Sequence, residues 1–432
     1  MNRPLLALVL AATALGACQR GAKPAGQDGL DSIAREYVLL SLTIGEKEEG
    51  YIDAYYGPAE LQAKAKADAA GQDLDALAHR TDELRKKLEG VISDDPMEAR
   101  RAKFISAQLT AAATRLRMLK GEKLAFDEEA KGLFGVAPEL KPLSSYDPVL
   151  AKIEKLVPGT GELADRVDAF QNRFNIPKER LKRVFDAAIG ECRRRTLEHI
   201  QMPKDERFDM SFVTGKSWSG YNYYQGNAHS RIEINTDLPI RISRAVDLGC
   251  HEGYPGHHVL NALLEQRLTK ERGWIEFSVY PLYSPQSLIA EGSANYGIDL
   301  AFPGDDQLNF GTKTLYPLAG LPTAQAADYL ALTHAMRDLA GARFTIAREY
   351  LEGRIDDAEA ARLTQKYGLV SAERAKQMTE FTKQYRTYVI NYGLGQDMVR
   401  AYVEAAGTDP KARWARMEKI LSEPTLPSDL KP

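Results

Sequence analysis

Apolar positions recur at helical spacing over most of the chain. In the segment 98–123, apolar residues follow one another at alternating four- and three-residue steps: Ile105, Leu109, Ala112, Leu116 and Leu119. This spacing places them on one face of an α-helix, which Gly121 would end. The segment 186–200 predicts another helix with a basic face. Helical patterns run from about residue 31 to 200 and again from about 257 to the C-terminus.

The pattern changes near residue 206, where the chain becomes aromatic and dotted with glycine. Between residues 230 and 238, Ile232 and Ile234 alternate with polar residues, which is the two-residue period of a half-exposed strand. The segment 238–252 then turns helical, and Pro239 suits its first turn. The predicted fold class is therefore mainly α, a large helical fold with a small β element.

The N-terminus predicts export. Arg3 precedes the apolar run 4–17, which is too short to span a bilayer as a helix, and Cys18 follows it. The ending LGAC is similar to a bacterial lipoprotein processing site, where Cys18 is lipidated and becomes the first mature residue. The alternative is an ordinary secretory signal that ends near a cysteine. Gln19 after the cysteine favours the outer membrane, so we expect a lipid-anchored protein facing the periplasm.

These patterns divide the chain into four parts. They are a signal peptide (1–18), a flexible tether (19–30), an N-terminal helical region (31–205) and a region that carries the candidate site (206–432). We expect the last two to form one continuous globular unit. The 57 basic and 60 acidic residues are interspersed, and the net charge is −3, so nucleic-acid binding has little electrostatic support.

Only two cysteines remain after Cys18, and two are too few for a disulfide framework. A single bridge between Cys192 and Cys250 is possible. Because Cys250 lies beside a histidine cluster, we expect it instead to pack as a small buried apolar group.

Three of the seven histidines lie within eight positions, in the stretch LGCHEGYPGHHVL at 248–260. A hydrolytic zinc site needs about three protein ligands, a place for water and a nearby carboxylate base. The stretch opens like H-E-x-x-H, in which two histidines one helical turn apart bind zinc and the glutamate reaches the water. His251 and Glu252 fit that opening, but four residues separate Glu252 from His257.

An unbroken helix could not make this spacing work. His251 and His258 would lie about 10 Å apart along the axis, too far to share one ion at about 2.1 Å each. His257 would point about 120° away from His251. Pro255 would clash with the carbonyl of His251, and the glycines on either side of it allow unusual backbone shapes. We therefore predict a bulge or tight turn after Glu252 that returns the second histidine to the first, and then a new helix.

A third ligand is expected from the stretch SPQSLIAEGSANYGIDL, which places Glu291 among mostly apolar residues. A carboxylate in such surroundings is costly to bury unless it is paired or bound to metal. Asn295 and Asp299 could orient a ligand histidine. The alternative is that the histidines are helix-cap or surface residues and that Glu291 lies on a helix surface.

Three motifs resemble an uncharacterised bacterial family, a domain of unknown function that is placed among the gluzincin zinc metallopeptidases. They are HEGYPGHH, the later EGSANY, and NYGLGQ near the C-terminus. The hallmarks of the family are H-E-x-x-P-G-H-H, E-G-W-A-x-Y and Y-x-x-G-Q. The resemblance covers roughly residues 30–430. It implies a metallopeptidase-like helical fold and one Zn²⁺ ion held by two histidines and one glutamate.

By position, the resemblance implies that His251 and His257 are the histidine ligands, Glu252 the general base and Glu291 the third ligand. Related gluzincins also place a glycine just before the second ligand, which favours His257. His258 remains the alternative second ligand.

Other positions are carried over less directly. Tyr392 matches the late tyrosine and by analogy would hydrogen-bond the oxyanion, unless it merely packs in a C-terminal helix. Tyr254 either lines the pocket or pins the turn. Ser293 stands where the family usually has Trp, which predicts a wider or more polar pocket beside Glu291. Gluzincins often have an edge strand before the first histidine, and here the strand at 230–238 would pair with an extended peptide.

We expect a lipid-anchored, zinc-dependent hydrolase, and specifically a peptidase that uses metal-activated water and a glutamate base. Its partners would be a peptide or small amide substrate and the membrane. Two other functions stay open: a non-catalytic metal-binding scaffold lipoprotein, and an amidase acting on a non-peptide or cell-wall amide. Side-chain preference, endo- or exo-cleavage and oligomeric state are not predicted.

Overall fold

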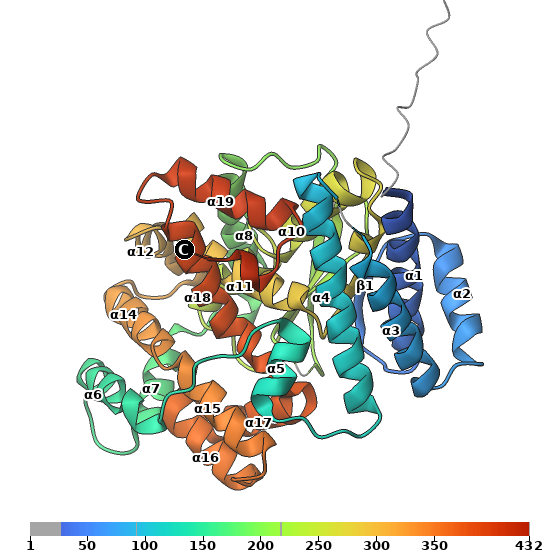
Figure 1. Ribbon diagram of the computed structural model, residues 1–432. Helices are drawn as coiled ribbons and strands as arrows, with labels where there is room; N and C mark the ends of the chain where they lie inside the picture. The colour runs from blue at the N-terminus through green and yellow to red at the C-terminus, as the bar shows by residue number, and fades with distance from the viewer. Residues whose placement is uncertain (1–26, 92, 217, 432) are drawn as a thin grey trace, which may run out of the picture.

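The computed structural model describes residues 27–91, 93–216 and 218–431. The N-terminal part is helical apart from one short strand (Figure 1). Its elements are α1 (Gln27–Gly45), β1 (Ile52–Tyr55), α2 (Ala59–Ala69), α3 (Leu74–Glu89), α4 (Pro96–Leu119), α5 (Phe126–Phe134), α6 (Asp147–Leu156), α7 (Leu163–Gln171) and α8 (Leu181–Leu197).

The remainder begins with strands and continues as helices. Its elements are β2 (Arg207–Val213), β3 (Gly220–Tyr224), β4 (His229–Asn235), α9 (Ser243–Glu252), α10 (His257–Leu264), β5 (Val279–Pro281), α11 (Pro285–Ala301), α12 (Asp306–Phe310), α13 (Tyr316–Ala319), α14 (Ala326–Arg337), α15 (Ala340–Leu351), α16 (Asp357–Gly368), α17 (Ala372–Tyr385), α18 (Ile390–Glu404) and α19 (Pro410–Ser422). The mainly helical fold with a small β element is confirmed.

The helical stripe of the segment 98–123 lies on α4. Its members Ile105, Leu109, Ala112 and Leu116 are buried, and α4 ends at Leu119, two residues before Gly121. Gly121 has a φ of 92°, a left-handed conformation that glycine adopts without steric cost. The segment 186–200 likewise belongs mostly to α8. Hydrophobic periodicity therefore predicted these helices correctly.

Three strands between α8 and α9 in the sequence form a sheet with the order β2-β4-β3. Ile232 and Ile234 on β4 are completely buried, as their alternation with polar residues predicted. β4 is nevertheless the central strand, parallel to β2 and antiparallel to β3. The prediction that this strand is a free edge was wrong, because both of its edges are occupied by ladder hydrogen bonds. β3 is an edge strand of this sheet.

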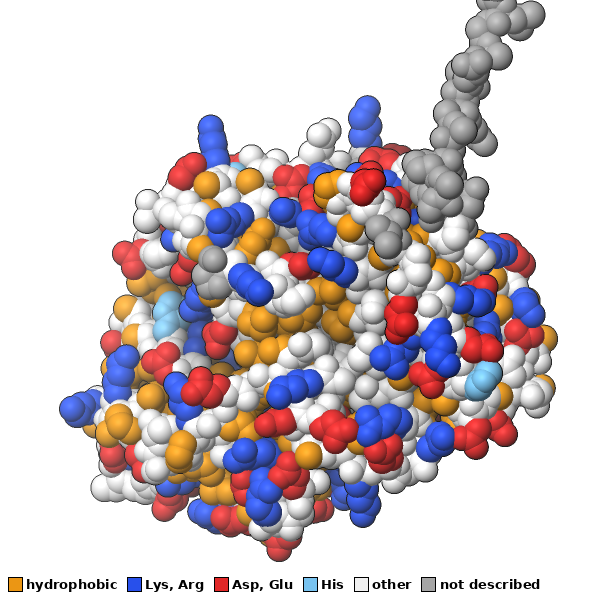
Figure 2. Space-filling view, viewed as in Figure 1, with side chains coloured by type: hydrophobic (Ala, Val, Ile, Leu, Met, Phe, Trp, Pro, Cys, Tyr) orange, Lys and Arg blue, Asp and Glu red, His pale blue; other side chains and the backbone are white. Residues whose placement is uncertain are grey.

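The N-terminal and C-terminal parts share one core. β1 pairs antiparallel with β5, so residues near 53 lie beside residues near 280. A single cluster of buried apolar side chains extends from Leu30 to Leu430. In Figure 1, α1–α3 lie on one side of the molecule, α15–α17 lie together at the bottom, and α11 and α18 lie above α15 near the middle of the view. Acidic and basic side chains are interspersed over the face seen in Figure 2.

Two sequence boundaries need correction. Pro239 lies ahead of α9 rather than in its first turn. The chain before α9 is held to the loop after α7, where Ile176 N donates to Ile240 O and Ile242 N donates to Phe174 O. The helix therefore begins only at Ser243.

The predicted tether (19–30) extends too far, because α1 begins at Gln27 and Leu30 is buried. The signal segment 1–18, with Cys18, and the start of the tether lie outside the described residues. In the described part of the chain, no helix is long and apolar enough to cross a membrane.

Candidate metal centre

A sharp turn between α9 and α10 brings the two histidines of the first motif together. His251 and Glu252 are the last two residues of α9, and His257 is the first residue of α10. The peptide bond between Tyr254 and Pro255 is cis. Gly256 N donates to Cys250 O at 3.1 Å, which folds the turn back onto the end of α9. The predicted turn and the new helix after it are confirmed.

Gly256 allows this turn because a side chain does not fit there. A Cβ built on Gly256 would lie 1.8 Å from His251 O, well inside the shortest real contact between such atoms. A Cβ on Gly253 would lie 2.6 Å from Gly249 O. The two glycines of the motif are therefore needed because the backbone of the turn lies very close to the backbone of α9.

His251, His257 and Glu291 converge on one point. The two Nε2 atoms of the histidines lie 3.1 Å apart. Glu291 Oε2 lies 3.3 Å from His251 Nε2, and Glu291 Oε1 lies 3.9 Å from His257 Nε2. One ligand atom from each residue can be chosen so that all lie within 4.8 Å of one another. The histidine side chains keep 13% and 14% of their surface exposed, and the Glu291 side chain keeps 8%.

This donor set fits a zinc ion. Two ligand atoms about 2.1 Å from one tetrahedral ion lie about 3.4 Å apart, close to the separation of the two Nε2 atoms. Glu291 Oε2 is buried and accepts no well-directed hydrogen bond from the described residues. Burial and the neighbouring charge of His251 lower the pKa of His257 to about 4. The His257 ring is thus neutral at pH 7, which is the form that binds metal.

Glu252 lies beside this cluster in a buried position, with only 4% of its surface exposed. Burial raises the pKa of Glu252 to about 7, and the charges of His251 and Glu291 oppose each other in modifying it. Asn222 Nδ2 on β3 donates to Glu252 O at 2.6 Å and ties the end of α9 to the sheet. A Cβ on Gly220 would lie 2.9 Å from Glu252 Oε1, so the glycine at the start of β3 leaves room for this carboxylate.

The second and third motifs meet because α11 and α18 cross very closely. A Cβ built on Gly292 would lie 2.4 Å from the carbonyl carbon of Gly395, and one built on Gly395 would lie 2.6 Å from Leu288 O. Only glycine permits backbones to approach this closely. The crossing carries the tyrosines around the start of α18 to Glu291.

Tyr388, just before α18, donates its hydroxyl hydrogen to Glu291 Oε1 at 3.0 Å. The predicted residue Tyr392 lies one turn later, with its ring centroid 5.9 Å from that of Tyr388. Burial raises the pKa of Tyr392 well above its ordinary value, and the negative charge of Glu291 adds to the effect. The Tyr392 hydroxyl therefore keeps its proton at neutral pH and can donate a hydrogen bond.

His258 points away from the cluster and is completely buried. Its Nδ1 lies 2.8 Å from Ser230 Oγ, and its Nε2 lies 3.1 Å from Glu206 Oε2. An ionised carboxylate can only accept, so His258 Nε2 donates to Glu206 Oε2. Tyr254 also donates to Glu206 Oε2. Of the two candidate second histidines, the structure brings only His257 to His251 and Glu291.

Glu206 accepts the hydrogen bonds of a second group of residues, which has a structural role and lies apart from the metal cluster. Burial alone would raise its pKa, but hydrogen bonds from His258, Tyr254 and Arg193 lower it to about 2. Arg193 Nε lies 2.9 Å from Glu206 Oε1. Tyr254 thus pins the turn to the chain before β2, which settles the choice between pinning the turn and lining a pocket.

Three neighbours of Glu291 do not take the places expected of them. Asn295 Nδ2 donates to the carbonyl oxygens of Glu291 and Tyr392, at 3.0 and 3.3 Å, and so joins α11 to α18. Asp299 pairs with arginines of α14 and α18 at the far end of α11. Neither orients a ligand histidine. Ser293 is completely buried and donates to Ala290 O, so it does not open a wider pocket beside Glu291.

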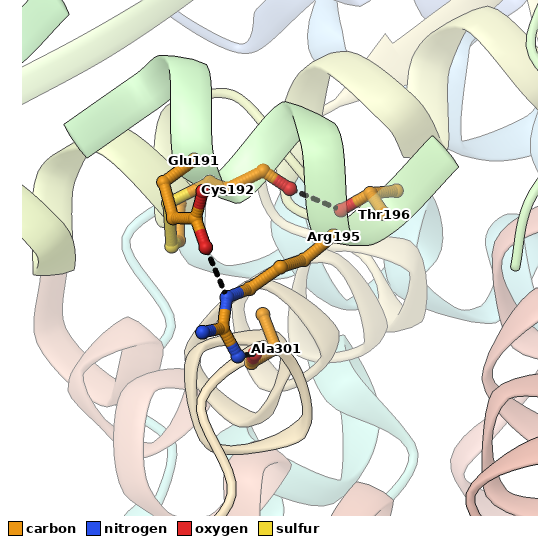
Figure 3. Close-up of a disulfide and its surroundings, with 6 residues drawn as sticks. Glu191, Cys192, Arg195, Thr196 and Ala301 are labelled. Carbon is orange, nitrogen blue, oxygen red and sulfur yellow. Dashed lines mark hydrogen bonds and ion pairs between the residues drawn. A yellow bond between two sulfur atoms is a disulfide. The ribbon is translucent and has the colours of Figure 1, made fainter. Parts of the chain in front are cut away.

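Cys250, next to His251, forms a disulfide with Cys192 of α8 (Figure 3). The expectation that Cys250 packs as a free apolar thiol was wrong, although the residue is buried. The packing of α8 against α9 brings the two Cα atoms to 5.5 Å, within bridging range. Beside the bridge, Arg195 Nε donates to Glu191 Oε1 at 2.7 Å, and Arg195 Nη1 donates to Ala301 O at 2.9 Å. The bridge fixes the helix that carries His251.

Asp53 on β1 is a site residue that the sequence did not suggest. Tyr221 on β3 donates its hydroxyl hydrogen to Asp53 Oδ1. Burial raises the pKa of Asp53 to about 6; the hydrogen bond from Tyr221 opposes this, and the negative charge of Glu291 adds to it. An acidic group from the N-terminal part therefore lies near enough to the cluster for the charge of Glu291 to raise its pKa. No local motif marks it, because it reaches the site only through the β1–β5 pairing.

No protein family and no curated protein matches the chain in sequence. The fold is similar to a crystal structure of a candidate lipoprotein from Colwellia psychrerythraea, with a TM-score of 0.51 and 14% sequence identity. The similarity covers 86% of this chain and 72% of the other. At this identity the likeness concerns the fold.

Proposed function

We propose that this protein is a lipid-anchored, zinc-dependent peptidase of the cell envelope. The observation that carries the proposal is the convergence of His251, His257 and Glu291 beside the buried carboxylate of Glu252. Two histidines and a carboxylate, with a second carboxylate that is not a ligand, are the donor set and base of hydrolytic zinc sites. The two histidine side chains are partly exposed, which gives water a route to the cluster in the proposed reaction.

Each of these residues has a role in the proposed reaction. His251, His257 and Glu291 would hold the zinc ion, which supplies a Lewis acid and brings the pKa of bound water toward 7. Glu252 accepts the proton of the attacking water and delivers it to the leaving amine, and a pKa of about 7 suits both transfers. Tyr392 keeps its proton and would donate a hydrogen bond to the substrate oxygen as negative charge develops there.

The edge strand β3 supports a peptide as substrate. It begins beside Glu252 and has no strand partner on its outer edge among the described residues. An extended peptide can add to such an edge through backbone hydrogen bonds, with alternate side chains entering pockets on either face. In this proposal β3, rather than β4, is the strand that pairs with the extended peptide.

The proposed location rests on the signal segment, Cys18 and the disulfide. The Cys192–Cys250 bridge is of a kind that persists in oxidising compartments such as the periplasm. The similar fold from Colwellia psychrerythraea is also described as a candidate lipoprotein. We propose that lipidated Cys18 anchors the protein to the periplasmic face of the outer membrane.

The proposal is tested by metal analysis and digestion of a peptide library. The full chain should bind one zinc equivalent and cleave peptides, and a chelator should abolish cleavage. Glu252→Gln should keep the zinc and lose at least about 100-fold in kcat, the scale of a lost general base. Glu89→Gln, an exposed glutamate at the end of α3, is the matched control and should behave as wild type.

Two outcomes would contradict the proposal. One is full peptidase activity in Glu252→Gln. The other is a purified chain that carries less than about a tenth of an equivalent of metal and does not bind added zinc, because structural and catalytic zinc sites bind tightly.

A further inference from the structure

Two arginines near the metal centre have no acidic partner. No carboxylate in the described part of the chain lies within ion-pairing distance, 4.0 Å, of Arg343 on α15 or Arg374 on α17. Arg343 Nε is buried and has no hydrogen-bond acceptor among the described residues. Within the described ranges, Arg374 donates to two neutral groups, Gln377 Oε1 at 2.9 Å and Ser219 Oγ at 3.2 Å. Most buried or half-buried arginines of this protein, such as Arg101, are paired with carboxylates.

Both side chains reach the border of the site. The Arg374 guanidinium is held by Ser219, whose neighbour Gly220 lies against the carboxylate of Glu252. The Arg343 guanidinium lies over the ring of Tyr392, 5.7 Å from its centroid. In Figure 1, α15 and α17 lie together next to the start of α18. The two arginines therefore approach from one side, next to the proposed base and the proposed oxyanion donor.

Holding these cations together without a counter-ion is unfavourable. Burial, together with the positive charges of Arg244, Arg241 and Arg343, lowers the pKa of Arg374 to about 10. Burial also lowers the pKa of Arg343. Both side chains still carry their charge at pH 7. A buried charge without a partner is costly, so an anion that binds here relieves a cost already present in the free protein.

Positive and negative side chains lie on different sides of the metal centre. The arginines lie on the α15–α17 side of the centre. Asp53 comes from β1, where the negative charge of Glu291 raises its pKa and its own charge raises that of Glu252. A guanidinium presents a planar fork that matches a carboxylate through two parallel hydrogen bonds. A peptide that lies across the centre would therefore place a carboxylate on the arginine side.

We infer that Arg343 and Arg374 form a recognition subsite for a carboxylate of the peptide substrate. This inference rests on the proposed peptidase function and adds a substrate class to it. Peptides offer a carboxylate at the C-terminus or on an Asp or Glu side chain. A C-terminal carboxylate in the subsite makes the enzyme cleave near the ends of short peptides, and a side-chain carboxylate gives it a preference for acidic sequences.

The inference is tested by binding rather than by turnover. Zinc-loaded Glu252→Gln full chain is titrated calorimetrically with Ala-Ala-Ala, with its C-terminal amide, and with amidated Ala-Glu-Ala. The free acid should bind at least about 10-fold more tightly than the amide, the scale of one lost charge-assisted contact. Adding Arg343→Ala or Arg374→Ala should remove that preference and leave the amide's Kd within about twofold. Arg35→Ala, at an exposed arginine of α1, is the control and should keep the preference.

Each result decides the question. Tight binding of amidated Ala-Glu-Ala, lost in the arginine variants, supports the subsite with a side-chain carboxylate as its ligand. Equal binding of Ala-Ala-Ala and its amide overturns the inference when amidated Ala-Glu-Ala binds no more tightly than they do. No measurable binding of any peptide, or equal weakening of all three peptides in the arginine variants, also overturns it. Arg343→Lys and Arg374→Lys keep the charge without the fork, so they should show an intermediate preference if the variants are folded. Because no cleavage is needed, failure of this subsite is distinguishable from failure of the peptidase proposal, which the library digestion measures.

Discussion

Gly292 on α11 and Gly395 on α18 lie so close together that a Cβ on Gly292 would be 2.4 Å from the carbonyl carbon of Gly395. This approach sets the distance between Glu291 and the tyrosines that precede and begin α18. A single extra methyl group at either position would push the helices apart. Gly292 of the EGSANY motif and Gly395 of the NYGLGQ motif are thus explained by helix packing.

Gly395→Ala should cost about 1–3 kcal/mol in the free energy of unfolding, because it overpacks a close helix crossing. It should also weaken zinc binding by moving Tyr388 away from Glu291. Chemical denaturation and a zinc titration measure both effects. The control is Gly190→Ala on α8, where a Cβ meets nothing within 4 Å and a gain of about 0.5–1 kcal/mol is expected. Equal stability of the two variants would contradict this account of the crossing.

Gly256→Ala should disrupt the metal centre more than the rest of the fold. The added Cβ would collide with His251 O, so His257 could no longer return to His251. We expect zinc affinity to fall by at least about 10-fold, comparable to the loss of a group that orients a ligand. Competition with a chromogenic chelator measures the change. A variant that binds zinc as tightly as wild type would show that the turn can form without this glycine.

Tyr388→Phe should weaken zinc binding by about 10- to 100-fold, since the hydroxyl that orients Glu291 is removed and little volume changes. The matched control is Tyr385→Phe, three residues earlier, whose hydroxyl makes no hydrogen bond to the ligand set among the described residues. Zinc dissociation constants and melting temperatures of both variants are compared. If the two variants lose affinity equally, the Tyr388 hydroxyl does not support the ligand.

Ionisation of Glu206 should make the free energy of unfolding depend on pH in the acidic range. Its pKa in the folded protein is about 2, below the ordinary value of 4.5. The stabilisation is therefore fully present above about pH 4.5 and is lost as the pH falls toward 2. Glu206→Gln should lower the melting temperature at pH 7, and its difference from wild type should shrink between pH 5 and 3. Glu89→Gln is the control. A difference that stays constant over this range would rule out the ionised network.

The Cys192–Cys250 bridge should contribute about 4 kcal/mol to the free energy of unfolding, the loop-closure scale for a sequence separation of 58 residues. The double variant Cys192→Ala/Cys250→Ala should lose about that amount in urea denaturation. Wild type treated with reductant should lose a similar amount. An unchanged urea midpoint of the wild type after reduction, with free thiols confirmed by titration, would contradict a structural role for the bridge.

Local chemistry explains what could be predicted from the sequence. The turn after Glu252 followed from Pro255 and two glycines, which forbid an unbroken helix, and from a spacing that such a helix could not use. Glu291 was marked by a carboxylate among apolar residues and by the family resemblance. The long helices followed from periodicity that survives without tertiary context, as on α4.

What could not be predicted depends on contacts between distant segments. Alternation along 230–238 shows which side chains are buried, but it carries no information on which strands occupy the edges, so β4 was misplaced. Tyr388 could have been suspected from its position one turn before Tyr392. Asp53, Arg343 and Arg374 carry no local signal, because the β1–β5 pairing and the packing of α15 and α17 decide where they point.

The pairing of β1 with β5 has a practical consequence for anyone who shortens this chain. All three motifs lie in 206–432, which invites expression of that fragment as a minimal enzyme. Such a fragment would lack Asp53 and Cys192, and it would leave the partner edge of β5 and much of the shared core without cover. The motif residues mark where the chemistry is proposed to occur, but the smallest unit able to hold them in place is nearly the whole folded chain.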